Sequence, residues 1–103
     1  MTQLRLTYAT AMVLQALAAG LQHGFDIIDA TGLRSGTVYP VLRRLEALGL
    51  ARSQWEAVRV ARSENRAPRK YYRLTRAAEP HVELARDRYP ALPNVKPLTA
   101  RGP

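Results

Sequence analysis

The stretch SGTVYPVLRRLEALGL, residues 35–50, decides the fold of this chain. Its apolar residues recur at the spacing of an α-helix, at Val38, Val41, Leu42, Leu45 and Leu48. We predict a helix from an N-cap at Ser35 to about residue 48, ended by Gly49. Pro40 lies inside this pattern, where a proline usually breaks a helix. At ~100° per residue it faces away from the apolar stripe, and the carbonyl that loses its bond belongs to Gly36, whose backbone can yield to the ring.

Two shorter helical patterns precede this helix. Between Thr7 and Ala19, apolar residues fall at i, i+3, i+4 and i+7, and Gly20 provides a stop. The segment GFDIIDAT, residues 24–31, fits a second helix, and Gly32 supports a turn that only glycine makes at low cost. The sequence therefore predicts three helices in order, the last two joined by a tight glycine turn.

After residue 49 the pattern changes to that of strands. The segments LARSQWE (50–56) and RKYYRLT (69–75) are rich in strand formers. Between them, AVRVARSENRAP (57–68) lacks an apolar period, and we predict it to be the tip of a basic hairpin. A final helix is predicted from Arg76 to about Tyr89, capped by Thr75. Prolines punctuate residues 91–103, which we predict to be disordered.

This order of elements is that of a winged helix-turn-helix. We therefore predict a mainly α fold with a small β-hairpin wing and one C-terminal helix. The predicted parts are a winged-helix DNA-binding domain at 1–76, a dimerisation helix at 77–90 and the tail at 91–103. In this plan the third helix enters the major groove and the hairpin contacts the backbone beside it.

The distribution of charge agrees with that plan. The formal net charge is +8, from 16 Lys and Arg against 8 Asp and Glu. Eleven of the sixteen cations lie between Arg34 and Arg76, with only three acids, and this concentration suits the neutralisation of phosphates. Fourteen of the cations are arginines, which fits recognition of phosphate or guanine but fits the codon bias of a GC-rich genome equally well.

Several classes of function are excluded. Because the chain has no cysteine, it has no disulfides and no thiolate catalysis. His23 and His81 lack companion ligands at a sensible spacing, so we expect no metal and no other cofactor. No activated nucleophile or acid–base pair is present, and we predict that the protein is not an enzyme. No apolar run approaches the ~20 residues of a membrane span, and the N-terminal pattern is that of an amphipathic helix rather than a signal peptide. The expected location is cytoplasmic.

Three segments resemble the PadR family of bacterial transcriptional regulators: HGFDII (23–28), SGTVYPVLRRLEALGLARSQWE (35–56) and APRKYYRLT (67–75). That family shows a His-Gly-aromatic segment, a Gly-Thr-aliphatic-Tyr-Pro recognition helix and a basic wing ending in Tyr-x-Leu-Thr. The resemblance covers about residues 7–75. It implies a winged-helix homodimer that binds an inverted repeat in double-stranded DNA near a promoter, usually as a repressor.

The resemblance also implies roles for individual residues. Residues 35–40 and Arg43 would contact DNA, and Tyr72 and Leu74 would belong to the core of the wing. With the neighbouring basic side chains, the predicted DNA-binding residues are Arg34, Ser35, Gly36, Thr37, Tyr39, Pro40, Arg43, Arg44, Arg66, Arg69 and Lys70. A stripe on the last helix, helped by N-terminal residues, is predicted to form the dimer: Leu4, Leu6, Tyr8, Ala78, Val82, Ala85 and Tyr89.

Other interpretations remain open at this point. The basic charge would serve an RNA-binding or ribosome-associated protein equally well, and a winged helix used for protein contacts would bind an acidic surface. The glycine turn and the short side chains that open the helix at 35–48 favour DNA. For Tyr39 we favour a phosphate hydrogen bond over a place at the edge of the core. Trp55 has two roles open to it, stacking on a small aromatic ligand or packing against the wing tyrosines, and we favour packing. His23 is expected to close the junction between the first two helices.

Overall fold

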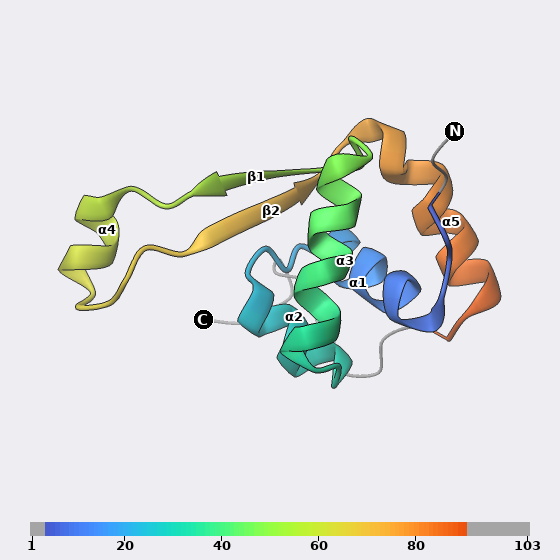
Figure 1. Ribbon diagram of the computed structural model, residues 1–103, viewed down its shortest axis with the longest axis horizontal. Helices are drawn as coiled ribbons and strands as arrows, with labels where there is room; N and C mark the ends of the chain where they lie inside the picture. The colour runs from blue at the N-terminus through green and yellow to red at the C-terminus, as the bar shows by residue number, and fades with distance from the viewer. Residues whose placement is uncertain (1–3, 91–103) are drawn as a thin grey trace.

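The structure, a computed structural model, describes residues 4–90. The predicted disorder of residues 91–103 lies outside the described residues. The elements follow in the order α1 (Tyr8–Ala18), α2 (Gly24–Thr31), α3 (Ser35–Ala47), β1 (Ala51–Trp55), α4 (Val58–Ser63), β2 (Lys70–Leu74), the 3₁₀ turn η1 (Arg76–Ala78) and α5 (Glu79–Arg88). The predicted mainly α fold with a hairpin wing is confirmed. Figure 1 shows the long hairpin extending from one side of a helical body, with α4 at its far end.

Helix α1 lies at the centre of the helical body. Every residue from Thr10 to Leu17 is buried, and α1 packs against α2, α3, α5 and β2. A helix enclosed in this way needs side chains that tolerate burial around its whole circumference. It begins at Thr7, whose hydroxyl oxygen accepts a hydrogen bond from the Thr10 backbone N–H at 3.2 Å. The other helices and the wing are positioned against this central element.

The turn between α2 and α3 is made by Gly32, as the sequence predicts. Its φ of 75° lies in the left-handed region, which glycine enters without a steric penalty from a Cβ. The N-cap predicted at Ser35 is wrong, because Arg34 holds that position and no side chain caps the helix. The predicted core stripe of α3 is confirmed by the burial of Val38, Val41, Leu42 and Leu45.

The wing is an antiparallel pair of strands. Its register runs from Ala51 opposite Leu74 to Trp55 opposite Lys70. The free edge of β2 is covered at one point, where the Tyr72 N–H donates to the Gln22 carbonyl at 2.8 Å. This bond ties the wing to the segment between α1 and α2.

The tip of the wing differs from the prediction. The sequence predicts that residues 57–68 form the tip of a hairpin and shows no apolar period there, whereas this tip contains the helix α4. Ala61 is buried there, and its carbonyl accepts a hydrogen bond from the Arg66 N–H at 3.1 Å. Asn65 has a φ of 56°, a left-handed conformation that asparagine tolerates better than most residues. A helix of six residues is too short to show a period in the sequence.

The C-terminal helix is divided in two. The sequence predicts one helix from residue 76 to 89, whereas a 3₁₀ turn precedes α5 and Pro80 lies in the first turn of α5. Thr75 holds the N-cap position of η1, but its side chain accepts no capping hydrogen bond, and its hydroxyl donates to the Gly49 carbonyl at 2.7 Å. Val82 and Ala85 are buried, and α5 packs on α1. Helix α5 therefore shares the core of the winged helix.

Candidate nucleic-acid interface

The outer face of α3 carries short side chains at the start of the helix and basic side chains further along. Ser35 and Gly36 are exposed, and Thr37 and Pro40 are half-buried. The following turns expose Arg43 and Arg44, as the angular pattern predicts. Within residues 4–90, no acidic side chain forms an ion pair with Arg34, Arg43 or Arg44. This face therefore offers free guanidinium groups beside a helix start that can approach another molecule closely.

Tyr39 has a packing role that the sequence interpretation ranked second. The side chain is half-buried against the core, and its ring covers Gly24 at the start of α2. A Cβ at position 24 would overlap the Tyr39 ring, so glycine is required there for close packing of α2 on α3. In the sequence, the His23–Gly24 pair was notable only as part of the family resemblance, which does not give the reason for the glycine. The hydrogen bond from Tyr39 to a phosphate stays a prediction.

The two faces of the wing differ in character. Because side chains alternate along a strand, Ser53, Trp55, Lys70 and Tyr72 share one face of the hairpin. This face is turned toward α3, since the Ser53 hydroxyl donates a hydrogen bond to the Glu46 carboxylate of α3. Lys70 Nζ lies 5.7 Å from the ring centroids of both Trp55 and Tyr72, which suits cation–π attraction. We call this the aromatic face of the wing.

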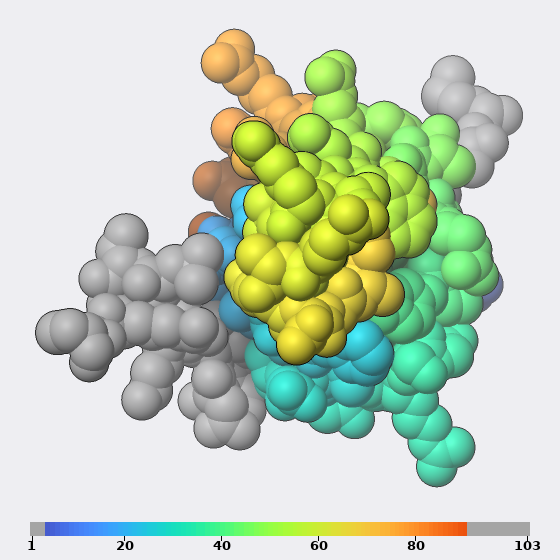
Figure 2. Space-filling view, turned by 90° about the vertical axis from the view of Figure 1, so that its left-hand side faces the viewer, coloured from blue at the N-terminus to red at the C-terminus, as the bar shows by residue number. Residues whose placement is uncertain are grey.

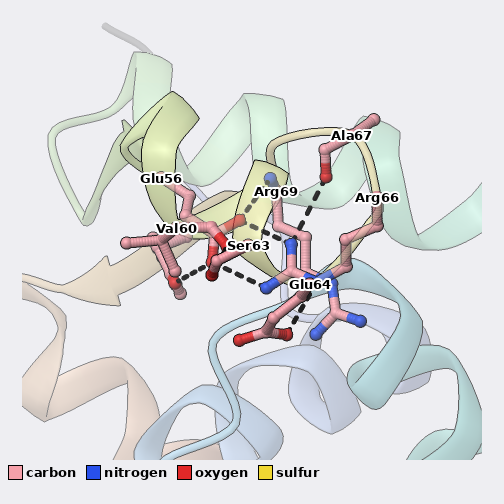
Figure 3. Close-up of polar contacts among 8 residues, drawn as sticks. Glu56, Val60, Ser63, Glu64, Arg66, Ala67 and Arg69 are labelled. Atoms are coloured by element: carbon pink, nitrogen blue, oxygen red, sulfur yellow. Dashed lines mark hydrogen bonds and ion pairs between the residues drawn. The ribbon is translucent and has the colours of Figure 1, made fainter.

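A cluster around Glu56 holds the tip of the wing in place (Figure 3). The Glu56 carboxylate accepts hydrogen bonds from Arg66 Nη1 and Nη2 at 2.5 and 2.7 Å. It also accepts from the Tyr71 hydroxyl at 3.0 Å and from the Arg69 backbone N–H at 3.3 Å. Together these hydrogen bonds lower the pKa of Glu56 to about 2, and the bond from Arg66 has the largest effect. Burial of the carboxylate acts in the opposite direction but does not cancel them. The cluster of Glu56, Arg66 and Tyr71 is called the wing clamp below.

The wing clamp changes the expectation for Arg66. The sequence interpretation placed Arg66 on DNA, but its guanidinium is bound by Glu56 and, through Nε at 3.1 Å, by Glu64. Direct phosphate binding by Arg66 is therefore not supported. Arg69 contributes only its backbone to the cluster, and its exposed side chain remains a predicted DNA contact. Lys70 also stays a predicted contact, from the aromatic face.

Trp55 does not pack in the way that the sequence interpretation favoured. Its side chain is 64% exposed. Together with Tyr39, Tyr72 and the start of α2, it lines a groove of about 560 Å³ between the wing and the helical body. The His23 ring lies 4.5 Å from that of Tyr71, at the junction of α1 and α2. A small aromatic ligand for the Trp55 groove stays a prediction.

The predicted dimer stripe is buried within the chain. Ala78, Val82 and Ala85 are no more than 6% exposed and face the core, so they do not form a free surface on the folded chain. The remaining predicted residues meet one another, since the Tyr89 hydroxyl donates to the Leu6 carbonyl at 3.2 Å and its ring packs edge-on against Tyr8 at 5.9 Å. Leu4 and Leu6 are half-buried against the core. Tyr8, at 50% exposure, is the member of the set most available to a partner.

Metal-binding clusters and membrane-spanning helices are both absent from residues 4–90. No group of three or more His, Cys, Asp or Glu side chains in this part of the chain is arranged to hold a metal ion. No helix in the same range is long and apolar enough to cross a membrane.

Comparisons with known proteins agree with this geometry. A sequence model of the Transcriptional regulator PadR-like family matches residues 13–83. A PadR family transcription regulator from hypervirulent Clostridium difficile R20291 has a similar structure, with a TM-score of 0.66 at 23% identity over 79% of this chain and 85% of that chain. A search of curated proteins gave no match.

Two further solved structures are similar. A cysteine-to-serine mutant of ZitR from Lactococcus lactis gives a TM-score of 0.65 at 18% identity, over 84% of this chain and 55% of that chain. A PadR-like transcription factor from Bacteroides fragilis gives 0.57 at 26% identity, over 75% and 76% of the two chains. The winged-helix arrangement is thus shared with proteins whose sequences differ at most positions.

Proposed function

Because the chain belongs to the PadR-like family of transcriptional regulators, we propose that it is a sequence-specific repressor that binds an inverted DNA repeat as a homodimer in the cytoplasm. Family membership makes it a DNA-binding regulator and confirms that it is not an enzyme. Sequence specificity, the repressor sign, the dimer and the inverted repeat belong to the proposal. They are supported by the resemblance of residues 23–75 to the family and by the surface of α3.

One observation carries the proposal of sequence-specific binding. The start of α3 exposes Ser35 and Gly36, and Arg43 lies two turns further along the same face without an ion pair in residues 4–90. Short side chains let a helix sit deep in the major groove, where an arginine fork can contact guanine O6 and N7. We assign base reading to Arg43 and phosphate positioning to Arg34 and Arg44.

The dimer in this proposal uses a surface other than the buried α5 stripe. Tyr8 at the start of α1 and Leu84 on α5 are 50% and 37% exposed. An interface between two copies needs a contiguous apolar patch, and in this proposal Tyr8 and Leu84 belong to that patch. The DNA-binding unit then extends beyond the predicted boundary at residue 76, because α5 completes its core.

Selection of bound duplexes from a random pool tests the proposal. We expect enrichment of a palindrome whose half-sites are one helical turn, or a multiple of it, apart. Arg43→Ala should weaken binding to the selected duplex by ~1–3 kcal/mol and relax the preference at one position of each half-site. Arg86→Ala, an exposed arginine on α5, is the matched control and should retain the preference. A pool without enrichment, or equal losses for selected and random duplexes in Arg43→Ala, contradicts the proposal.

A further inference from the structure

The face of the wing opposite the aromatic face carries two arginines side by side. Arg52 of β1 and Arg73 of β2 are direct partners in the strand register, and both are exposed. Directly opposed like charges destabilise a strand pair. No carboxylate of residues 4–90 forms an ion pair with either of them. We call these two residues the outer arginine pair.

The outer arginine pair borders a groove of about 660 Å³. Gln22 and Gln54 also line this groove, and each has a side-chain amide that can donate hydrogen bonds. Glu56 lines it as well, but the wing clamp binds the Glu56 carboxylate through Arg66 and Tyr71. The charge that faces the groove without a partner is therefore positive.

We propose that the outer arginine pair and its groove bind a phosphoryl anion. The Arg52 and Arg73 side chains line the same groove, and a guanidinium group can donate two N–H bonds to one phosphate in bidentate fashion. A bound anion would also offset the repulsion between the two arginines. The site is separate from the reading surface, because Arg52 points to the face opposite Ser53, which contacts α3.

The anion has two possible sources, a phosphate of the DNA backbone or a small phosphorylated molecule. The first source rests on the proposed function, since it requires the protein to bind DNA. The second does not depend on it.

Inorganic phosphate is the first probe. Thermal unfolding is measured in phosphate and in chloride at equal ionic strength, for the wild type, Arg52→Glu and the control Arg86→Glu. The wild type and the control should unfold at a higher temperature in phosphate, because a ligand that binds only the folded state stabilises it. Arg52→Glu should show a smaller rise, because only the general stabilisation by phosphate remains, and it should be more stable than the wild type in chloride, since glutamate opposite Arg73 replaces repulsion by attraction. An equal phosphate response in all three proteins overturns the proposal.

Duplex binding distinguishes the two sources. If the pair takes a backbone phosphate, Arg52→Gln should reduce the slope of log affinity against log salt by ~1 relative to Arg86→Gln on a random duplex. If Arg52→Gln leaves the slope unchanged, while phosphate still raises the unfolding temperature of the wild type, the site binds a small phosphorylated molecule. Failure of the proposed function has a different signature, in which no duplex is enriched while the phosphate response remains.

Discussion

Replacing Pro40 with alanine separates the stability of α3 from its use in binding. Proline has no N–H, so the bond that residue 40 would donate to the Gly36 carbonyl is not made. The steric part of the cost is reduced, because residue 36 is a glycine, whose backbone adjusts more readily than that of a residue with a side chain. One net hydrogen bond contributes ~1 kcal/mol, and the full cost of an interior proline is ~3 kcal/mol. We therefore expect Pro40→Ala to raise the free energy of unfolding by ~1–2 kcal/mol.

Thermal unfolding and duplex binding measure the two effects. For a domain of this size the midpoint should rise by ~4–8 °C for each kcal/mol. Pro80→Ala is the matched control, because Pro80 lies in the first turn of α5, where a backbone N–H has no partner within the helix. That control should change stability by less than ~0.5 kcal/mol. Affinity for the selected duplex should fall in Pro40→Ala by about fivefold, as an apolar ring on the groove-facing side is lost.

Two results would refute this reasoning. If Pro40→Ala is no more stable than the wild type, the half-buried ring contributes packing that outweighs the missing hydrogen bond. If stability rises and affinity for the selected duplex is unchanged, the proline is not kept for DNA binding.

Three further predictions concern packing, pH and assembly. Gly24→Ala should destabilise the fold by ~1–3 kcal/mol through overlap with the Tyr39 ring, and Tyr39→Leu should recover part of that loss in a double-mutant cycle followed by denaturant unfolding. The pKa of Glu56 is lowered from 4.5 to about 2 in the folded chain. Its contribution to stability is therefore complete above pH 4.5 and is lost as the pH falls toward 2. The thermal midpoint of Glu56→Gln should depend less on acid pH than that of the wild type, and an equal dependence contradicts this. Tyr8→Arg and Leu84→Arg should each yield folded monomers in light scattering, and an unchanged dimer would exclude this surface.

Local patterns in the sequence predicted the helical part of the fold well. The apolar stripe of α3 is long and regular, and Gly32 marks a turn whose left-handed conformation excludes most other residues. Such features depend on neighbours within a few positions along the chain. The same local reasoning placed Pro40 on the outer side of α3.

Contacts between distant segments could not be predicted in the same way. Arg66 and Glu56 are ten positions apart with no period to join them, and their pairing becomes visible only when the hairpin register is known. A periodic stripe such as Val82 and Ala85 shows that one face is buried, but does not show whether the covering surface belongs to α1 or to a second chain. The Tyr39 ring over Gly24 is likewise a contact between two helices.

The wing clamp predicts a response to Arg66→Ala unlike that of a phosphate contact. A tip without order would lose conformational entropy on binding, whereas the clamp fixes α4 and its exposed Arg59 and Arg62 before DNA arrives. Figure 2 looks onto the wing from its tip, which stands toward the viewer in front of the helical body. Arg66→Ala should therefore lower duplex affinity and leave the salt slope nearly unchanged, while Arg69→Ala should reduce the slope by ~1. Hydrogen exchange of the 57–65 amides should become faster in Arg66→Ala only. A slope reduced equally in both variants would show that Arg66 leaves Glu56 to bind a phosphate directly.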